Sequence, residues 1–391
     1  MSAARQTDPE KPLLLVGDSY RHAEIYHLTG FLAPDAFVTL EHGKDLLILA
    51  SSLEFGRAQK ESRATAVRNL DELGLRELAA AGHKGDELMA EMIVRLLKER
   101  GLGEVDVPRG FPVGLADPLR AKGITLGIRR NLAERRRTKR PDEVAAIEAA
   151  QRATEEAWAL GVDAIRRSTV NASRELVLDG AVFTAERLRA LIEAALLERG
   201  CGSPEGTICA PGPQAADPHQ EGTGPLHAGE SIVMDIYPQS NKTRYYADMT
   251  RTVSKGEPHL EIVRMYEVVK RAQDACIAAL KPGVTGRFLH ELAEDIIFEA
   301  GYDTLRPGQQ HGASKAPQGF IHGLGHGVGL EIHEEPSVGR SGTKPLLPGD
   351  VVTIEPGVYD PAIGGVRLED MLLVTADGAR NLTRAPRQLI V

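Results

Sequence analysis

Residues 320–336, which read FIHGLGHGVGLEIHEEP, carry the most informative pattern of the chain. They hold three of the protein's 12 histidines: His322, His326 and His333. Glycine has no Cβ, so the glycines between them allow the backbone to approach a ligand closely and the imidazoles to converge on one point. A glycine-rich loop with solvated histidines is the alternative, but three imidazoles this close together favour a binding site.

Four carboxylates stand in apolar, strand-like runs on either side of this stretch. Asp235 lies in SIVMDIYP and Asp248 in RYYADMTRT, while Glu355 lies in VVTIEPGVY and Glu369 in GVRLEDMLLV. Any one of them either faces water on a half-exposed strand or is buried and paired. Four beside a histidine cluster predict a cage of oxygen ligands with one imidazole, whose negative charge two divalent cations would neutralise.

The order of these residues resembles that of the pita-bread metallopeptidases, which include methionine aminopeptidase, aminopeptidase P and prolidase. The matching pieces are Asp235, the MTRT that follows Asp248, HGLGHGVGLEIHE, the IEPG around Glu355 and the VRLED around Glu369. The N-terminal part, with YHLTGF, resembles the proline-specific branch of this family. The resemblance implies an α/β (α+β) fold, with a creatinase-like domain over residues 1–134. A pita-bread domain with a pseudo-two-fold internal repeat would follow over residues 135–391.

By position, the resemblance makes Asp235 a ligand of one metal and His326 a ligand of the other. Asp248 and Glu369 would bridge both metals, and Glu355 would bind one of them and also move protons. Two divalent ions per subunit are implied, as Mn²⁺, Zn²⁺ or Co²⁺. A water molecule between two such ions has a lowered pKa and acts as the nucleophile near neutral pH.

The resemblance also implies roles for residues outside this ligand set. His322 and His333 flank the ligand in the family motif HxxxHxxxxxxH, where they contact the substrate carbonyl and the proline side of the peptide. His219, in AADPHQEG, stands where the family has a histidine that protects or orients substrate; a solvated loop histidine is the alternative. Arg367 faces the same side of a strand as Glu369. It is expected to hold either the bridging carboxylates or the substrate's C-terminal carboxylate.

The interval between Asp235 and Asp248 is two residues longer than the family's usual interval. An insertion of two residues preserves the alternation of side chains along a strand, so both aspartates still face one side. Within the loop 237–244, Tyr237 and Arg244 are expected either to reach the substrate or to be ordinary turn residues.

Two helical segments in the C-terminal part resemble each other. VFTAERLRALIEAALLERG and GVTGRFLHELAEDIIFEAG share threonine, leucine, glutamate and glycine at equivalent positions, beginning with Thr184 and Thr285. Chance similarity between amphipathic helices is the alternative. Because each segment follows a long helix and precedes strands, we favour a duplicated α/β unit. The first half contains both aspartates and the second contains His326 and both glutamates, so the metal site is expected between the halves.

Composition argues against several other classes of protein. A net charge of −8 over 391 residues makes nucleic acid or an anionic membrane an unexpected partner. The basic run 129–140 therefore indicates a solvated linker before a helix that begins at Pro141. Three cysteines without a CxxC pattern are typical of reduced thiols in a cytoplasm. The polar start and the short apolar run at residues 13–16 indicate neither a signal peptide nor a membrane span.

Together these features predict a cytoplasmic Xaa-Pro dipeptidase that forms a homodimer and hydrolyses the bond before a C-terminal proline. Aminopeptidase P, which accepts longer peptides, is the near alternative, and a non-enzymatic peptide-binding relative is the alternative from another class. Methionine aminopeptidases usually lack the large N-terminal domain, and creatinase works without the metal set. The length of the N-terminal domain favours the shorter prolidase arrangement.

Overall fold

The computed structural model describes residues 11–306 and 318–391, and the chain divides into two compact units, Met1–Arg136 and Arg137–Val391. Residues 1–10, on which the expectation of a leaderless chain partly rests, lie outside the described residues. Within the described ranges, no helix has both the length and the apolar composition that crossing a membrane requires. The sequence places a domain boundary between residues 134 and 135.

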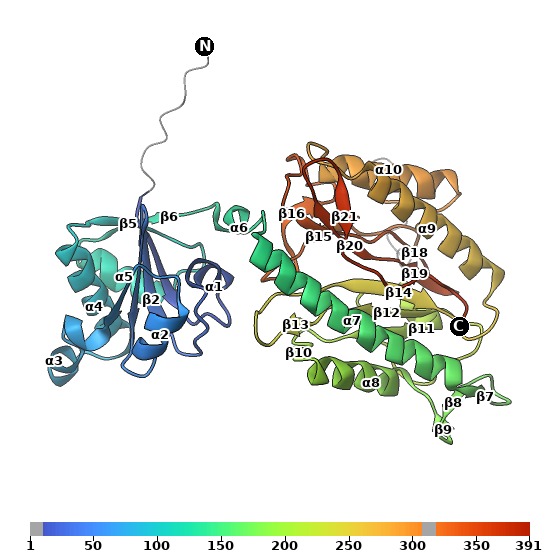
Figure 1. Ribbon diagram of the computed structural model, residues 1–391. Helices are drawn as coiled ribbons and strands as arrows, with labels where there is room; N and C mark the ends of the chain where they lie inside the picture. The colour runs from blue at the N-terminus through green and yellow to red at the C-terminus, as the bar shows by residue number, and fades with distance from the viewer. Residues whose placement is uncertain (1–10, 307–317) are drawn as a thin grey trace, which may run out of the picture. The chain divides into compact units, whose positions relative to one another are not determined.

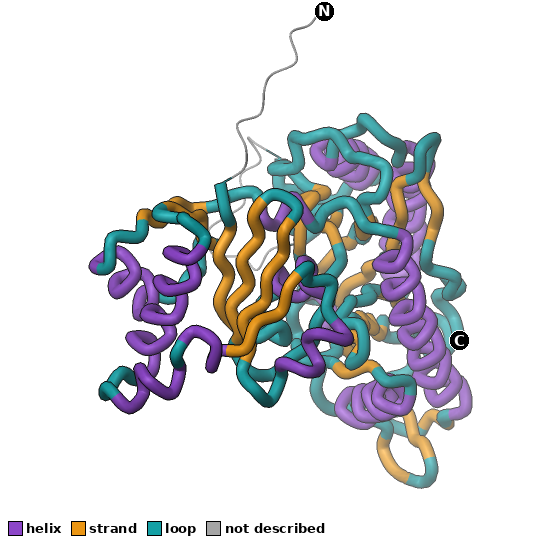
Figure 2. The backbone as a smooth tube through the Cα atoms, turned by 60° about the vertical axis from the view of Figure 1, so that its left-hand side comes forward, coloured by secondary structure: helices purple, strands orange, loops and turns teal. Residues whose placement is uncertain are grey.

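The first unit is built on a six-stranded sheet with the order β4-β3-β2-β1-β5-β6 (Figures 1 and 2). Its strands are β1 (Leu13–Gly17), β2 (Phe37–His42), β3 (Asp45–Ala50), β4 (Ala66–Asn69), β5 (Glu104–Val107) and β6 (Thr125–Ile128). Its α-helices are α1 (Ala23–Thr29), α2 (Phe55–Glu61), α3 (Leu75–Ala80), α4 (Gly85–Glu99), α5 (Val113–Ala121) and α6 (Leu132–Arg135).

Helices cover both faces of this sheet, which explains why β1 is an uninterrupted apolar run. Leu14 and Val16 belong to the core formed with α4 and α5, whereas Leu13 and Leu15 belong to the core formed with α1 and α2. A strand buried on both faces has no polar side to alternate with the apolar one. Gly30 ends α1 with φ 61°, and β2 and β3 form a hairpin.

The second unit begins with the long helix α7 (Pro141–Arg167), as the proline and acids at its start predict. Its other helices are α8 (Ala185–Glu198), α9 (Leu260–Ala279) and α10 (Gly286–Glu299). Its strands include β10 (Cys201–Gly202), β11 (Ile208–Pro211), β12 (Ile232–Ile236), β13 (Gln239–Ser240), β14 (Met249–Val253), β15 (Gly325–Gly327), β16 (Glu334–Val338), β17 (Val351–Ile354), β18 (Gly357–Asp360), β19 (Gly364–Arg367), β20 (Asp370–Val374) and β21 (Ala379–Asn381). A small sheet of β7 (Thr169–Val170), β8 (Leu176–Leu178) and β9 (Ala181–Val182) follows α7.

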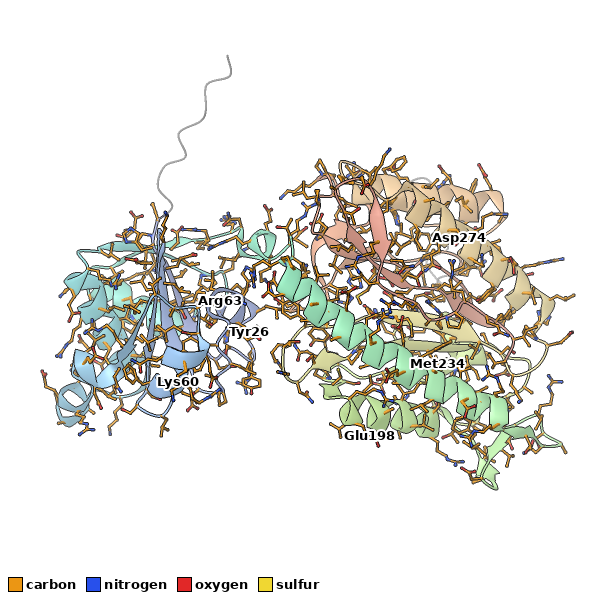
Figure 3. All side chains as sticks on the ribbon, in the orientation of Figure 1. Tyr26, Lys60, Arg63, Glu198, Met234 and Asp274 are labelled. Atoms are coloured by element: carbon orange, nitrogen blue, oxygen red, sulfur yellow. The ribbon has the colours of Figure 1, made fainter. Side chains whose placement is uncertain are left out.

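The expected repeat is visible in this unit. In the first half, α7 packs on α8 and is followed by the sheet β11-β12-β14; in the second, α9 packs on α10 and is followed by β16-β15-β17-β20-β21. Thr184 and Thr285 cap the two equivalent helices by accepting a hydrogen bond from a first-turn backbone N–H. Each threonine also forms a β-bridge with a proline. Met234, labelled in Figure 3, is buried on β12 where α7 crosses the sheet.

The expectation of a solvated basic linker is wrong for the residues just before α7. Arg137 and Lys139 are each only 8% or less exposed. The Arg137 guanidinium donates two hydrogen bonds to the Asp350 carboxylate, at 2.8 and 2.6 Å, and Lys139 Nζ lies 2.6 Å from Glu334 Oε1. A buried cation requires a paired carboxylate. Both partners lie far along the sequence, so the basic run shows no local sign of this pairing.

Candidate active site

A cavity of about 610 Å³ opens where the two halves of the second unit meet. Hydrogen bonds join the halves beside it: Glu369 N donates to Thr250 O at 3.0 Å, and Arg367 N donates to Thr252 Oγ1 at 3.0 Å. The cavity is lined by all nine residues singled out from the sequence, namely His219, Asp235, Asp248, His322, His326, His333, Glu355, Arg367 and Glu369.

The ends of antiparallel strand pairs position the four carboxylates. Asp235 lies on β12 opposite Thr250 of β14, and Asp248 directly precedes β14, two residues before Thr250. Side chains two residues apart share a face, so both aspartates face the cavity, as the even-numbered insertion predicts. In the other half, Ile354 pairs with Asp370 across β17 and β20. Glu355 and Glu369 flank this pair at the strand ends rather than lying within strands.

Donor atoms from both halves converge around His326. Single donor atoms of Asp248, His326 and Glu369 all lie within 4.8 Å of one another. His326 Nε2 lies 3.2 Å from Glu355 Oε1 and 3.5 Å from Asp248 Oδ2. Carboxylate oxygens with one imidazole are donors that suit Mn²⁺, Zn²⁺ or Co²⁺.

The hydrogen bonds of His326 leave Nε2 as the donor that faces the carboxylates. Nδ1 lies 3.1 Å from Gly327 O, and a backbone carbonyl can only accept, so Nδ1 carries a proton. Burial disfavours the charged imidazole, but the hydrogen bond to Glu355 and the nearby carboxylates outweigh burial and raise the pKa of His326 to about 9. A metal ion at Nε2 would therefore compete with a proton.

The carboxylates of the cavity lie close enough to repel one another, and some of their oxygens lack hydrogen-bond partners. Burial, followed by repulsion from neighbouring carboxylates, raises the pKa of Asp248 and of Glu369 well above the usual range. Among residues 11–306 and 318–391, Asp235 Oδ1 and Glu369 Oε1 are buried and have no hydrogen-bond partner. Divalent cations would satisfy these oxygens and offset the repulsion, so the residues present fit a metal centre.

A buried hydrogen-bonded chain runs from Asp235 to His322. Arg367 Nη2 donates to Asp235 Oδ2 at 2.6 Å, and Nη1 donates to Tyr359 Oη at 3.0 Å. Tyr359 Oη lies 2.8 Å from His322 Nε2, while His322 Nδ1 lies 2.7 Å from Gly323 O. Because Gly323 O accepts from Nδ1–H, Tyr359 donates to Nε2, and both ring nitrogens of His322 are engaged. Arg367 bonds Asp235 rather than the two carboxylates expected to bridge the metals.

The remaining predicted residues lie toward the open side of the cavity. His333 is exposed, and its ring packs edge-on against His326 with centroids 4.3 Å apart. His219 is an exposed residue of the loop after β11, and its backbone N–H donates to Asp217 Oδ1 at 3.0 Å. In the inserted loop, Tyr237 lines the cavity, whereas Ser240 belongs to β13 and pairs with Cys201 of β10.

Several residues of this site were not singled out from the sequence. Thr250 donates to Glu369 Oε2 at 2.8 Å and accepts from Arg367 Nε at 3.1 Å, while Thr353 donates to Glu355 Oε1 at 3.2 Å. Each threonine stands two residues from a predicted ligand, and this spacing was a usable signal. Tyr359 and the cavity-lining Glu205 carry no comparable local signal.

Two glycines of the histidine-rich stretch lie very close to neighbouring backbone. A Cβ on Gly325 would lie 2.1 Å from Thr353 O, and one on Gly327 would lie 2.4 Å from Glu335 O. These glycines therefore allow the backbone of β15 to approach neighbouring chain segments.

The pita-bread fold and the acidic residues and imidazole around one cavity together identify the class of protein as a metallopeptidase. The chain belongs to metallopeptidase family M24, whose sequence pattern matches residues 145–376.

Individual relatives agree with this assignment. The Xaa-Pro dipeptidase of Pyrococcus furiosus is 40% identical over 185 residues, which are 47% of this chain and 49% of that protein. The chain thus spans about half the length of the curated relatives it matches first. The prolidase structure from Pyrococcus horikoshii has a TM-score of 0.76 at 26% identity, covering 97% of this chain and 96% of that one. The X-Pro aminopeptidase structure from Thermotoga maritima has a TM-score of 0.80 at 25% identity, covering 98% of each chain. These likenesses confirm the expected fold.

Proposed function

We propose that the protein is a metallo-exopeptidase that hydrolyses Xaa-Pro dipeptides before the C-terminal proline. The observation that supports this most directly is the convergence of Asp248, His326 and Glu369 in a cavity of about 610 Å³. The similarity to a Pyrococcus furiosus protein named Xaa-Pro dipeptidase supports the choice of substrate.

We propose two divalent metal ions per subunit, as Mn²⁺, Zn²⁺ or Co²⁺. Asp235 and His326 would each hold one ion, both ions would share Asp248 and Glu369, and Glu355 would complete the set. When bound, such ions supply Lewis acidity and lower the pKa of a water molecule. The unpartnered oxygens of Asp235 and Glu369 support this ligand set.

The remaining residues position the substrate and move protons. Glu355 accepts a proton from the attacking water and passes it to the leaving nitrogen, which as a proline amide nitrogen has none of its own. His333 and His219, exposed on the open side, contact the proline side of the peptide. His322, fixed by Tyr359 and Gly323, faces the scissile carbonyl. Arg367 holds Asp235 in place through a charge-assisted hydrogen bond.

The proposal also covers the domain division, the cellular location and the oligomeric state of the protein. Residues 1–134 form a creatinase-like domain and residues 135–391 the catalytic domain. The protein is cytoplasmic and homodimeric, with no nucleic-acid or membrane partner. The buried state of Cys201, Cys209 and Cys276 is compatible with reduced thiols.

Chelation is expected to abolish activity reversibly. Because five donor residues surround the cavity, dialysis against EDTA should remove two metal ions per chain, and adding back Mn²⁺, Zn²⁺ or Co²⁺ should restore turnover. Elemental analysis and Ala-Pro hydrolysis measured on the same samples test this expectation. Full activity in excess EDTA, with no bound metal, would refute the metal centre.

Xaa-Pro aminopeptidase activity on longer peptides is the second candidate. The Thermotoga maritima X-Pro aminopeptidase matches this chain over 98% of both lengths. The length of the N-terminal domain therefore does not separate the two activities, contrary to the expectation from sequence.

Dipeptides are expected to be better substrates than tripeptides. A dipeptide presents a carboxylate directly after the proline ring, where His219 and His333 can donate hydrogen bonds to it. The measurement is kcat/KM for Ala-Pro and Leu-Pro against the same sequences extended by one residue. Equal or faster cleavage of the tripeptides would favour the aminopeptidase assignment.

A further inference from the structure

One carboxylate in the cavity has no part in the proposed metal centre. Glu205 lines the same cavity as the metal-site residues, and its side chain is exposed. It lies between β10 and β11, away from the strand ends that supply the four caged carboxylates. Its presence in the wall adds a negative charge that the hydrolytic chemistry does not use.

A tight turn and two tyrosines hold Glu205 in place. Gly206 N donates to Ser203 O at 3.1 Å, and Pro204 and Gly206 occupy the second and fourth positions of this turn, as turn chemistry favours. Glu205 Oε1 accepts a hydrogen bond from Tyr246 Oη at 3.1 Å, and its backbone carbonyl accepts from Tyr237 Oη at 3.4 Å. Tyr246 is 6% exposed, so the carboxylate is anchored to a buried side chain.

The charge of Glu205 is not neutralised by a neighbouring cation. Across residues 11–306 and 318–391, no lysine, arginine or histidine forms an ion pair with it. Asp235, by contrast, is paired with Arg367. His333 lines the same cavity as Glu205.

The wall around Glu205 combines this charge with apolar surface. Ile208, Ile332 and Tyr237 line the same cavity. A lysine or arginine side chain matches such a surface, because its methylene stem packs on apolar groups while its charged head meets a carboxylate.

We propose that Glu205 makes the enzyme selective for dipeptides whose residue before proline is lysine or arginine. This inference rests on the proposed function, since it concerns the substrate of the same site. The proline ring is uncharged, so a side-chain cation must come from the preceding residue. The substrate's α-ammonium is attached beside the scissile carbonyl and stays near the metal-site carboxylates. A lysine ammonium extends four methylenes beyond the α-carbon and can reach the separate carboxylate of Glu205.

The test compares kcat/KM for Lys-Pro and Arg-Pro with that for Met-Pro, a neutral substrate of similar length, using the metal-loaded full chain. We expect the wild-type enzyme to favour the cationic substrates by about tenfold, as one favourable charge pair predicts. Glu205→Gln should bring the ratio of Lys-Pro to Met-Pro close to one. Glu205→Lys should reverse the charge preference, so that Glu-Pro becomes better than Lys-Pro.

Glu221→Gln is the matched control. Glu221 is an exposed carboxylate on the neighbouring loop, 4.0 Å from Arg189, and it does not belong to the described lining of the cavity. Its replacement removes the same charge from nearby surface and should preserve the substrate ratio of the wild-type enzyme.

Three results would overturn the proposal, and Ala-Pro distinguishes them. Equal wild-type kcat/KM for Lys-Pro and Met-Pro would show that Glu205 does not select a cation. A uniform loss in Glu205→Gln with every substrate, including Ala-Pro, would assign Glu205 to the α-ammonium or to structure. No cleavage of any Xaa-Pro dipeptide, including Ala-Pro, would reject the proposed function itself, and the selectivity with it.

Discussion

Replacing Glu369 or Asp248 by alanine is expected to lower kcat by about a thousandfold or more. Each carboxylate is buried in the centre of the site, within 4.8 Å of the His326 donor atom. Removing either one deletes a proposed bridge between two divalent cations and leaves those cations close together with less negative charge between them. Metal content should fall together with turnover. The measurements are Ala-Pro hydrolysis and elemental analysis of each purified variant.

His333→Ala is the informative control for these two variants. His333 packs on His326 but is exposed and lies outside the proposed ligand set. Its removal should damage turnover while metal content remains, which separates substrate contacts from metal binding. If Asp248→Ala kept near-normal kcat together with normal metal content, the proposed ligand assignment would be wrong.

Arg251→Met is expected to destabilise the protein by about 3–5 kcal/mol, because it removes one partner of a buried ion pair. Arg251 is 1% exposed, and its Nη2 donates to Asp370 Oδ1 at 2.7 Å. The same guanidinium donates to the carbonyls of Thr250 and Glu369, so it joins strands of the two halves. Methionine has a similar stem but no donors, so the hydrogen bonds from the guanidinium to Asp370 and to these carbonyls would be lost, although Asp370 would keep the one from Asn381.

Thermal and denaturant unfolding measure this effect. Arg264→Met is the control, since Arg264 is a largely exposed arginine of α9 whose ion pair with Glu261 is at the surface. It removes the same charge and should change stability little. If Arg251→Met unfolded at the same denaturant concentration as Arg264→Met, the buried network would not be important for stability.

Nine residues that line the cavity were recognisable without coordinates. The sequence features that revealed them are local: the histidine spacing, the carboxylates in apolar runs and the even-numbered insertion. Such features can be interpreted because side chains repeat with a fixed period along a strand or a helix. The two-residue repeat of a strand places Asp248 and Thr250 on one face wherever the strand lies, and the even-numbered interval to Asp235 lets its side chain share that face. The equivalent caps at Thr184 and Thr285 are local in the same way, because a capping side chain bonds to its own first turn.

Ion pairs between residues that are distant in the sequence were not predicted. The basic residues before α7 looked like a solvated run, yet Arg137 and Lys139 are buried against Asp350 and Glu334. Likewise, Arg367 was expected to serve the bridging carboxylates or the substrate, but its guanidinium bonds Asp235. In both cases the sequence showed a charged residue, but it did not show which residue that charge pairs with.

The sequence by itself determined the secondary structure around the site, the internal repeat and nine of the residues that line the cavity. Only the tertiary structure decided which charges neutralise each other, why Gly325 and Gly327 have no side chains, and that Glu205 lies in the cavity wall. The physical reason is the range of the interactions. Strand alternation and helix capping depend on neighbours in the chain, while ion pairs, close backbone contacts and cavity walls join segments that meet only after the two halves pack together.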